Sequence, residues 1–345
     1  MGTGTTGLRS LTSSLLAAAF CLTSICAASA GGQLEAVKSA GELACGVVRE
    51  DYDYSKEQTH GNLSALGTDI CKAVAAAVLG ENGKLKVSSF PDEQHGLEAL
   101  RAGKLAVLAG ATPRVTMGAI YRVAFSQPFF FDGQGFMTPK TAGIKTLADL
   151  TDKQVCFIGN TEAESVLDAV LRGRGINFRP FSFEEQGEME AALFTGHCAA
   201  MTGDLTQLAN SRAAFHARNF VILPEIITLD PLAAAFRDDD PQWAAIVNWT
   251  MYALIQAEAS GVTRANVDAM STSEDLTVNR WLTKAGGLGR ALGLDDDWAV
   301  HVIKAVGNYG EMFDRDVGKN SPLQFERGMN ALWTEGGMIY PLPGR

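Results

Sequence analysis

An alternation of short apolar strands with helical segments, which occurs twice along the chain, most constrains the fold. In the first half, apolar or alternating runs at 43–48, 84–91 and 104–110 are typical of strands. Helical patterns at 69–80 and 93–103 separate these runs, and the first pattern ends on a glycine, as helices commonly do. Strands that alternate with helices form parallel sheets, because each return to the sheet needs a crossover. The first half therefore predicts an α/β lobe.

The same alternation starts again after residue 138 and predicts a second α/β lobe. Its expected strands lie at 154–159, 198–203 and 220–225, and its expected helices lie at 162–175 and 188–196. A long helix expected at 241–261 has an apolar face that can pack back onto the first lobe. We therefore expect a first lobe over 31–138, a second lobe over 139–226, and a return to the first lobe with a helical C-terminal extension over 227–345.

Residues 1–30 are expected to be a cleavable signal peptide. They contain one positive charge, Arg9, then an apolar stretch from Leu15 to Cys26, and they end in the small residues 28–30. A membrane-spanning helix needs about 20 apolar residues, and serine and threonine interrupt this stretch. We therefore expect an exported protein that is released into the periplasm.

Composition and motifs exclude several classes of function. The formal net charge of −10 disfavours nucleic acids and anionic lipids as partners. The five histidines are scattered and no cysteine pair has C-x-x-C spacing, so we expect no metal site. The glycine-rich run at 286–293 follows no strand, so it is not a dinucleotide fingerprint, and we expect no cofactor.

Four cysteines remain after the signal segment, and an even number in an oxidising compartment predicts two disulfides. Counting alone leaves three connectivities open. The neighbouring elements favour Cys45–Cys71 and Cys156–Cys198, because each pair would join one strand to a nearby element of the same lobe.

The chain resembles the periplasmic amino-acid-binding proteins of ABC transporters, in particular the general L-amino-acid-binding branch. The resemblance covers nearly the whole chain after the signal segment and is strongest at 132–137, 223–270 and 292–318. It implies a type II periplasmic binding protein, in which two hinge-linked α/β lobes close on one small-molecule ligand. It also implies a monomer that delivers this ligand to the permease subunits of a transporter and catalyses nothing.

Candidate ligand contacts follow expected strands, where α/β proteins bind their ligands. Arg114 and Thr116 follow the strand at 104–110, Thr161 follows the strand at 154–159, and Asp204 follows the strand at 198–203. The resemblance implies that Thr161 holds the carboxylate of the ligand and that Asp204 holds its amino group. Thr161 and Asp204 are also good helix N-caps, and that alternative stays open for both.

The residues of the first lobe depart from the family pattern. Ala119 stands where the family has the arginine that grips the ligand carboxylate. Arg114 lies in the same loop and is predicted to replace that arginine, because a guanidinium matches a carboxylate geometrically. Arg122 and Arg49 are alternative candidates for this arginine. If Arg114 does not bind the ligand, we expect it to be a solvent-exposed arginine of the loop. Tyr54 matches the aromatic wall that the family presents to its ligand, or else packs in the hinge.

Two other functions remain open. Some proteins on this fold are enzymes, such as dehydratases or hydrolases, but no nucleophile and base stand out by their spacing. A binding protein can also be diverted from transport to sensing, or to the service of a periplasmic dehydrogenase. Lost recognition of a carboxylate would favour a ligand other than an ordinary amino acid.

Overall fold

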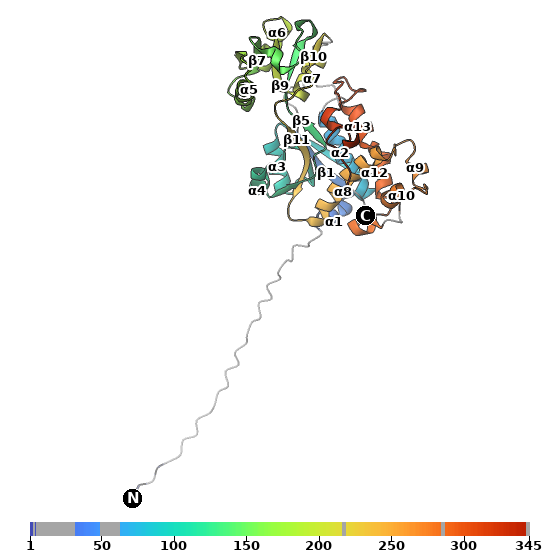
Figure 1. The fold of residues 1–345 in the computed structure, drawn as a ribbon. Helices are drawn as coiled ribbons and strands as arrows, with labels where there is room; N and C mark the ends of the chain where they lie inside the picture. Colours follow the sequence, from blue (N-terminus) through green and yellow to red (C-terminus); the bar gives the residue numbers. More distant parts are fainter. Residues whose placement is uncertain (3, 5–31, 49–62, 216–218, 284–286, 343–345) are drawn as a thin grey trace. The chain divides into compact units, whose positions relative to one another are not determined.

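The computed structural model describes residues 1, 2, 4, 32–48, 63–215, 219–283 and 287–342 (Figure 1). Residues 31–345 form one compact unit that contains two sheets. The segment expected to be a signal peptide lies almost wholly outside the described residues, as do Arg49 and Tyr54. Among the described residues, no helix combines the length and the apolar character that a bilayer span requires.

The first sheet has the strand order β2-β1-β3-β11-β4, with β5 also paired to β11. Its strands are β1 (Glu42–Val48), β2 (Lys84–Phe90), β3 (Val107–Ala111), β4 (Val123–Phe125), β5 (Phe130–Asp132) and β11 (Asp230–Arg237). The three strands β1, β2 and β3 are parallel, so their carboxyl ends meet at one edge. β11 runs antiparallel to β3, β4 and β5, and it brings a distant part of the chain back into this sheet.

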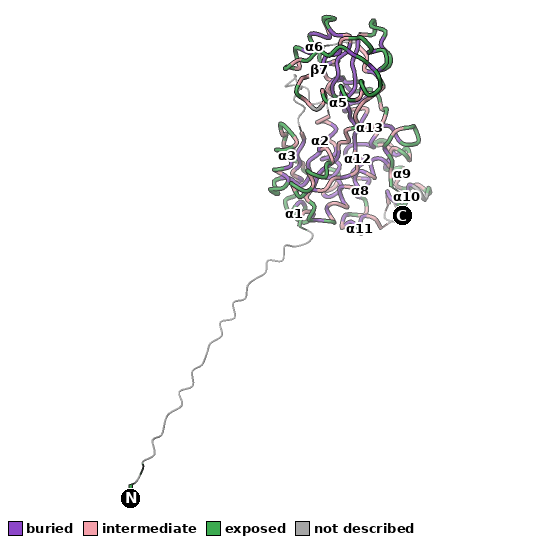
Figure 2. Tube along the Cα trace, turned by 60° about the vertical axis from the view of Figure 1, so that its left-hand side comes forward, coloured by how far each residue is buried: buried purple, intermediate pink, exposed green. Residues whose placement is uncertain are grey.

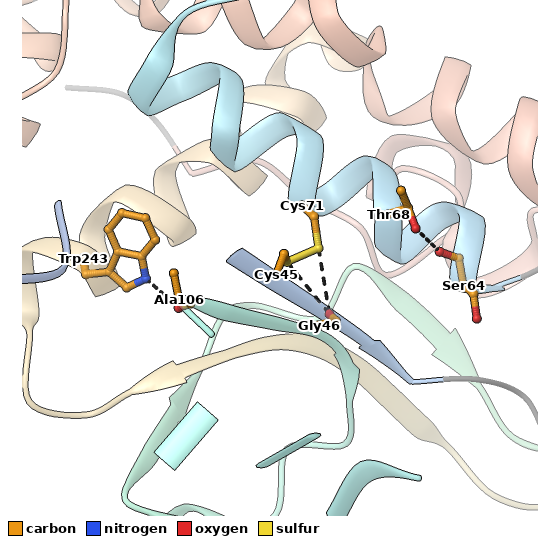
Figure 3. The surroundings of a disulfide bond; sticks show 7 residues. All are labelled: Cys45, Gly46, Ser64, Thr68, Cys71, Ala106 and Trp243. Carbon is orange, nitrogen blue, oxygen red and sulfur yellow. Dashed lines mark hydrogen bonds between the residues drawn. A yellow bond between two sulfur atoms is a disulfide. The ribbon is translucent and has the colours of Figure 1, made fainter. Parts of the chain in front are cut away.

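Helices connect and cover the first sheet. They are α1 (Gly32–Ala40), α2 (Leu63–Leu79), α3 (Glu93–Arg101) and α4 (Val115–Tyr121). The Cys45–Cys71 disulfide joins β1 to α2, with 6.0 Å between the two Cα atoms (Figure 3). The prediction for this pair is confirmed. α2 begins six residues before the helix expected from Asp69, and its centre is almost wholly buried.

The second sheet has the strand order β10-β6-β9-β7-β8. Its strands are β6 (Gln134–Pro139), β7 (Gln154–Ile158), β8 (Arg179–Phe183), β9 (Ala200–Asp204) and β10 (Phe220–Ile222). Its helices are α5 (Glu162–Gly173), α6 (Gln186–Phe194) and α7 (Leu205–Ala214). The Cys156–Cys198 disulfide ties β7 to the start of β9, with a Cα–Cα distance of 5.9 Å, as predicted. The two sheets together confirm the two-lobed α/β fold class.

The chain crosses between the sheets slightly earlier than expected. β6 begins at Gln134, so a boundary between 138 and 139 would divide a strand of the second sheet. The crossing therefore lies at Gly133, between β5 and β6. A Cβ atom at Gly133 would collide with the carbonyl oxygen of Thr228, so the two crossing segments touch backbone to backbone there.

The C-terminal part is helical, as predicted, and packs on the first sheet. It contains α8 (Pro241–Ala259), α9 (Val267–Met270), α10 (Leu276–Leu282), α11 (Leu288–Leu292), α12 (Trp298–Val306) and α13 (Tyr309–Asp316). α2, α8 and α12 share one hydrophobic core with β1 and β3, and much of their length is buried (Figure 2). The indole N–H of Trp243 donates to the Ala106 carbonyl oxygen at 2.9 Å, and this bond joins α8 to the residue just before β3 (Figure 3).

Candidate functional site

The first candidate loop joins β3 to α4. Arg114 occupies the N-cap position of α4 in an extended conformation, and its side chain makes no capping hydrogen bond. Arg114, Thr116 and Ala119 are all exposed. The predicted ligand-binding arginine therefore lies at the surface of this loop.

Glu93 supplies the acidic neighbour of Arg114. Its carboxylate accepts a hydrogen bond of 3.1 Å from the backbone N–H of Thr112, the first residue after β3. Burial raises the pKa of Glu93, while the Thr112 N–H and the charge of Arg114 act in the opposite direction. Arg114 thus interacts electrostatically with a carboxylate of the protein itself.

The second candidate, Thr161, is a helix cap. Its hydroxyl group donates to the Ile158 carbonyl oxygen at 2.7 Å and accepts from the Glu164 N–H at 3.4 Å. The carboxylate of Glu164 in turn accepts from the Asn160 N–H at 2.8 Å. The capping alternative is therefore realised at Thr161, and its hydroxyl proton is already engaged.

The third candidate, Asp204, occupies the N-cap position of α7 without using its side chain as a cap. Asp132 supplies the side chain that satisfies this helix end. Its carboxylate accepts from the Thr206 hydroxyl group at 2.5 Å and, more weakly, from the Thr206 N–H at 3.4 Å. Asp204 is exposed, so its carboxylate stays accessible. The capping alternative is therefore not realised at Asp204.

Asp204 interacts electrostatically with two other carboxylates, Asp132 and Asp230, where the chain crosses between the sheets. Asp132 is only 6% exposed, and burial together with the Asp204 charge raises its pKa to about 7. Asp204 is exposed, but neighbouring protein atoms displace part of the water around its carboxylate, and this partial desolvation together with the Asp230 carboxylate raises the pKa of Asp204 as well. Asp230 is the register partner of Asp132 in the β5–β11 pair and accepts from the Thr228 hydroxyl group at 2.6 Å. An ammonium group would relieve the repulsion between these carboxylates.

Arg122 pairs with a carboxylate of the protein, although its side chain stays largely exposed. It caps the C-terminus of α4 with a φ of 55° and forms an ion pair of 3.3 Å with Asp238. Within the described parts of the chain, no hydrogen bond or ion pair joins Arg114, Thr116, Thr161 and Asp204 to one another. The same parts contain no group of three or more histidine, cysteine, aspartate or glutamate side chains placed to hold a metal ion.

Glu93, Asp132 and Asp230 were missed by sequence reasoning. Glu93 is the first residue of α3, Asp132 is the last residue of β5, and Asp230 is the first residue of β11. An acidic residue at such a boundary between an element and a crossover was the sequence signal that could have indicated them. Asp132 is also the first residue of the segment 132–137, one of the segments in which the resemblance to the family is strongest.

Comparison with known proteins decides the family. The general L-amino acid-binding periplasmic protein AapJ of Rhizobium johnstonii is 37% identical over 316 residues, which cover 90% of this chain and 92% of that protein. The chain belongs to the periplasmic amino-acid-binding proteins of ABC transporters. The glutamate/glutamine/aspartate/asparagine-binding protein BztA of Rhodobacter capsulatus is another relative of this family, 33% identical over 93% of this chain and 96% of its own length.

A solved periplasmic binding protein has the same fold. The periplasmic binding protein from Brucella ovis with glutathione bound is 35% identical, has a TM-score of 0.73, and is matched over 90% of this chain and 99% of its own. A profile of the family described as NMT1/THI5 like matches residues 130–228. These relatives are solute-binding proteins rather than enzymes, so this chain is a type II periplasmic binding protein and the enzymatic alternative is not supported.

Proposed function

We propose that this protein captures a small solute carrying an amino group in the periplasm and delivers it to the permease subunits of an ABC transporter. The residues 1–30 serve as the signal peptide in this proposal, and the protein acts as a monomer. The names of the relatives support an amino acid or a related compound: general L-amino acids, four named amino acids, and glutathione. All of these compounds carry an α-amino group.

The observation that carries the proposal is the free carboxylate of Asp204. An aspartate at an N-cap position ordinarily accepts from the helix backbone, but here Asp132 satisfies the helix end. Asp204 is left exposed at the carboxyl end of β9, with a second carboxylate, Asp230, near it. We assign to Asp204 the binding of the ligand ammonium group, with Asp230 adding negative potential.

The remaining predicted contacts complete the proposed site. Arg114 and Thr116 contribute from the loop between β3 and α4, and Thr161 orients the first turn of α5, whose backbone N–H groups favour anions. Tyr54 supplies the aromatic wall. The lobes close by bending at Gly133 and at the return segment before β11, where the chain crosses between the sheets.

A thermal-shift screen tests the proposal. The panel contains the common L-amino acids, glutathione, aliphatic amines and organic acids that lack nitrogen. A ligand that binds only the folded state stabilises it by about 2.7 kcal/mol at a hundredfold excess over its Kd. We expect amine-bearing compounds alone to raise the Tm. Stabilisation by acids without nitrogen, or by no compound at all, would contradict the proposal.

A further inference from the structure

Glu93 and Thr112 meet at the edge of the first sheet where ligands are expected. Glu93 is the first residue of α3 and follows β2, while Thr112 follows β3. These two strands flank β1 on either side and run parallel to it, so their carboxyl ends lie at the same edge. The hydrogen bond of 3.1 Å from the Thr112 N–H to Glu93 therefore spans the end of β1.

The capping of α3 does not require the Glu93 carboxylate. Asp92 is the N-cap, and its carboxylate accepts from the His95 N–H at 2.9 Å and lies 2.7 Å from the imidazole of His95. An acidic residue in the first turn is favourable for any helix. That effect does not require its side chain to contact another strand. Glu93 does so and is partly buried as a result.

Glu93 occupies a corner of the sheet edge that is formed by the Thr112 N–H and Arg114, and the groups of this corner are suited to bind a carboxylate. A backbone N–H and a nearby guanidinium are the two kinds of donor that bind carboxylates well in proteins. Thr112 provides the first, and Arg114 acts on the same carboxylate through space. The protein's own side chain thus occupies donors that a ligand carboxylate would otherwise use.

We propose that Glu93 determines specificity by filling this corner, so that the preferred ligand is an amine without a carboxylate at the end facing the first lobe. This inference rests on the proposed function, in which Asp204 binds the amino group of the ligand. It adds that the part of the ligand facing Glu93 carries no carboxylate. A compound with an α-carboxylate has to displace Glu93 or lie beside its negative charge. The corner and Asp204 together present two carboxylates and one guanidinium, which favours a cationic ligand over an anionic one.

The corner can be tested without knowing the ligand. We would titrate acetate into ¹⁵N-labelled protein and follow the Thr112 amide in wild type, Glu93→Ala, and the control Glu98→Ala. Glu98 lies on the same helix but is exposed, and its carboxylate accepts a hydrogen bond from Gln94, one turn earlier on that helix. We expect a saturable Thr112 shift in Glu93→Ala and none in the other two proteins. No response in Glu93→Ala, or an equal response in wild type, would overturn the proposal.

Specificity is then measured with a matched pair, L-lysine and cadaverine, which differ only in the α-carboxylate. Calorimetry on the same three proteins, and on Glu93→Gln to keep the side chain's shape, gives the ratio of the two Kd values. We expect wild type and Glu98→Ala to favour cadaverine, and Glu93→Ala to shift the ratio toward L-lysine by about tenfold to hundredfold. An unchanged ratio overturns the specificity role. Failure of both compounds to bind any variant counts against the proposed function, and the acetate titration still decides the role of Glu93.

Discussion

Asp132, at the end of β5 in the first sheet, accepts a hydrogen bond of 2.5 Å from the hydroxyl group of Thr206, in the first turn of α7 in the second lobe. This bond crosses the point where the chain passes between the two sheets. It gives α7 a cap from another strand and leaves the side chain of Asp204 free. One aspartate therefore caps the helix, and the other, Asp204, is the one that we propose to bind the ligand.

Replacement of Asp132 by asparagine is expected to flatten the dependence of stability on pH. The pKa of Asp132 is raised from 3.8 to about 7, so the folded state holds a proton that the unfolded state has lost. The contribution of Asp132 to the free energy of unfolding is fully present below pH 3.8, the pKa of the group in the unfolded chain. This contribution is lost as the pH rises through about 7, the pKa in the folded protein. Each pKa unit corresponds to about 1.4 kcal/mol. Urea unfolding at pH 5 and pH 8 should show a smaller loss for Asp132→Asn than for wild type, and an equal loss would contradict this account.

Binding of an amine is expected to weaken as pH falls. The pKa of Asp204 is raised above 3.8, so its carboxylate takes up a proton at a higher pH than an ordinary aspartate. A bound ammonium favours the charged carboxylate, so binding should release protons at mildly acidic pH. Calorimetry in two buffers of different ionisation enthalpy measures that release. An affinity that rises on acidification would argue against Asp204 as the ammonium partner.

Trp243→Phe is expected to destabilise the fold by about 1–3 kcal/mol, because it leaves the buried Ala106 carbonyl without its indole donor. Trp243 is only 1% exposed. Trp333→Phe is the matched control, since Trp333 is 63% exposed, and it should change stability by no more than about 0.5 kcal/mol. Urea denaturation followed by circular dichroism measures both. Similar values for the two variants would show that the Trp243 bond is not stabilising.

The Cys156–Cys198 bond is expected to stabilise the protein by roughly 3 kcal/mol, since it closes a long loop of the second lobe. The double variant Cys156→Ala/Cys198→Ala removes the bond without leaving a free thiol. Thermal unfolding should move to lower temperature relative to wild type. Non-reducing peptide mapping supplies the control, and a peptide that links cysteines of different lobes would contradict the pairing.

The sequence predicted the parts of the fold that depend on local pattern. The strand at 43–48 and the long helix at 241–261 are found as β1 and α8 because their apolar periodicity is strong. β11 was not predicted, since its alanine-rich run has little strand preference of its own and becomes a strand by pairing with β3 and β4. β8 was missed because Pro180 argues against a strand, and it is tolerated there on the sheet edge.

The site was less predictable because it depends on which strands become neighbours. Asp204 was placed correctly at a strand end, but nothing in the sequence indicates that Asp132 would cap α7 in its place. The ion pair of Arg122 with Asp238 likewise depends on the fold, which places β11 beside β4. Glu93 contacts Thr112 only because β2 and β3 lie on either side of β1, and strand order cannot be read from residue pattern alone.

Calorimetric titration of wild type and Asp204→Asn with the compounds that raise the Tm tests the central claim most directly. Asp204 makes no capping bond, so the substitution should leave folding almost unchanged. We predict one saturable site in wild type and a tenfold to hundredfold weaker Kd in Asp204→Asn, since a hydrogen bond to a charged group contributes about 1.5–3 kcal/mol. Equal affinity in the two proteins would contradict the assignment of Asp204 as the residue that binds the amino group of the ligand.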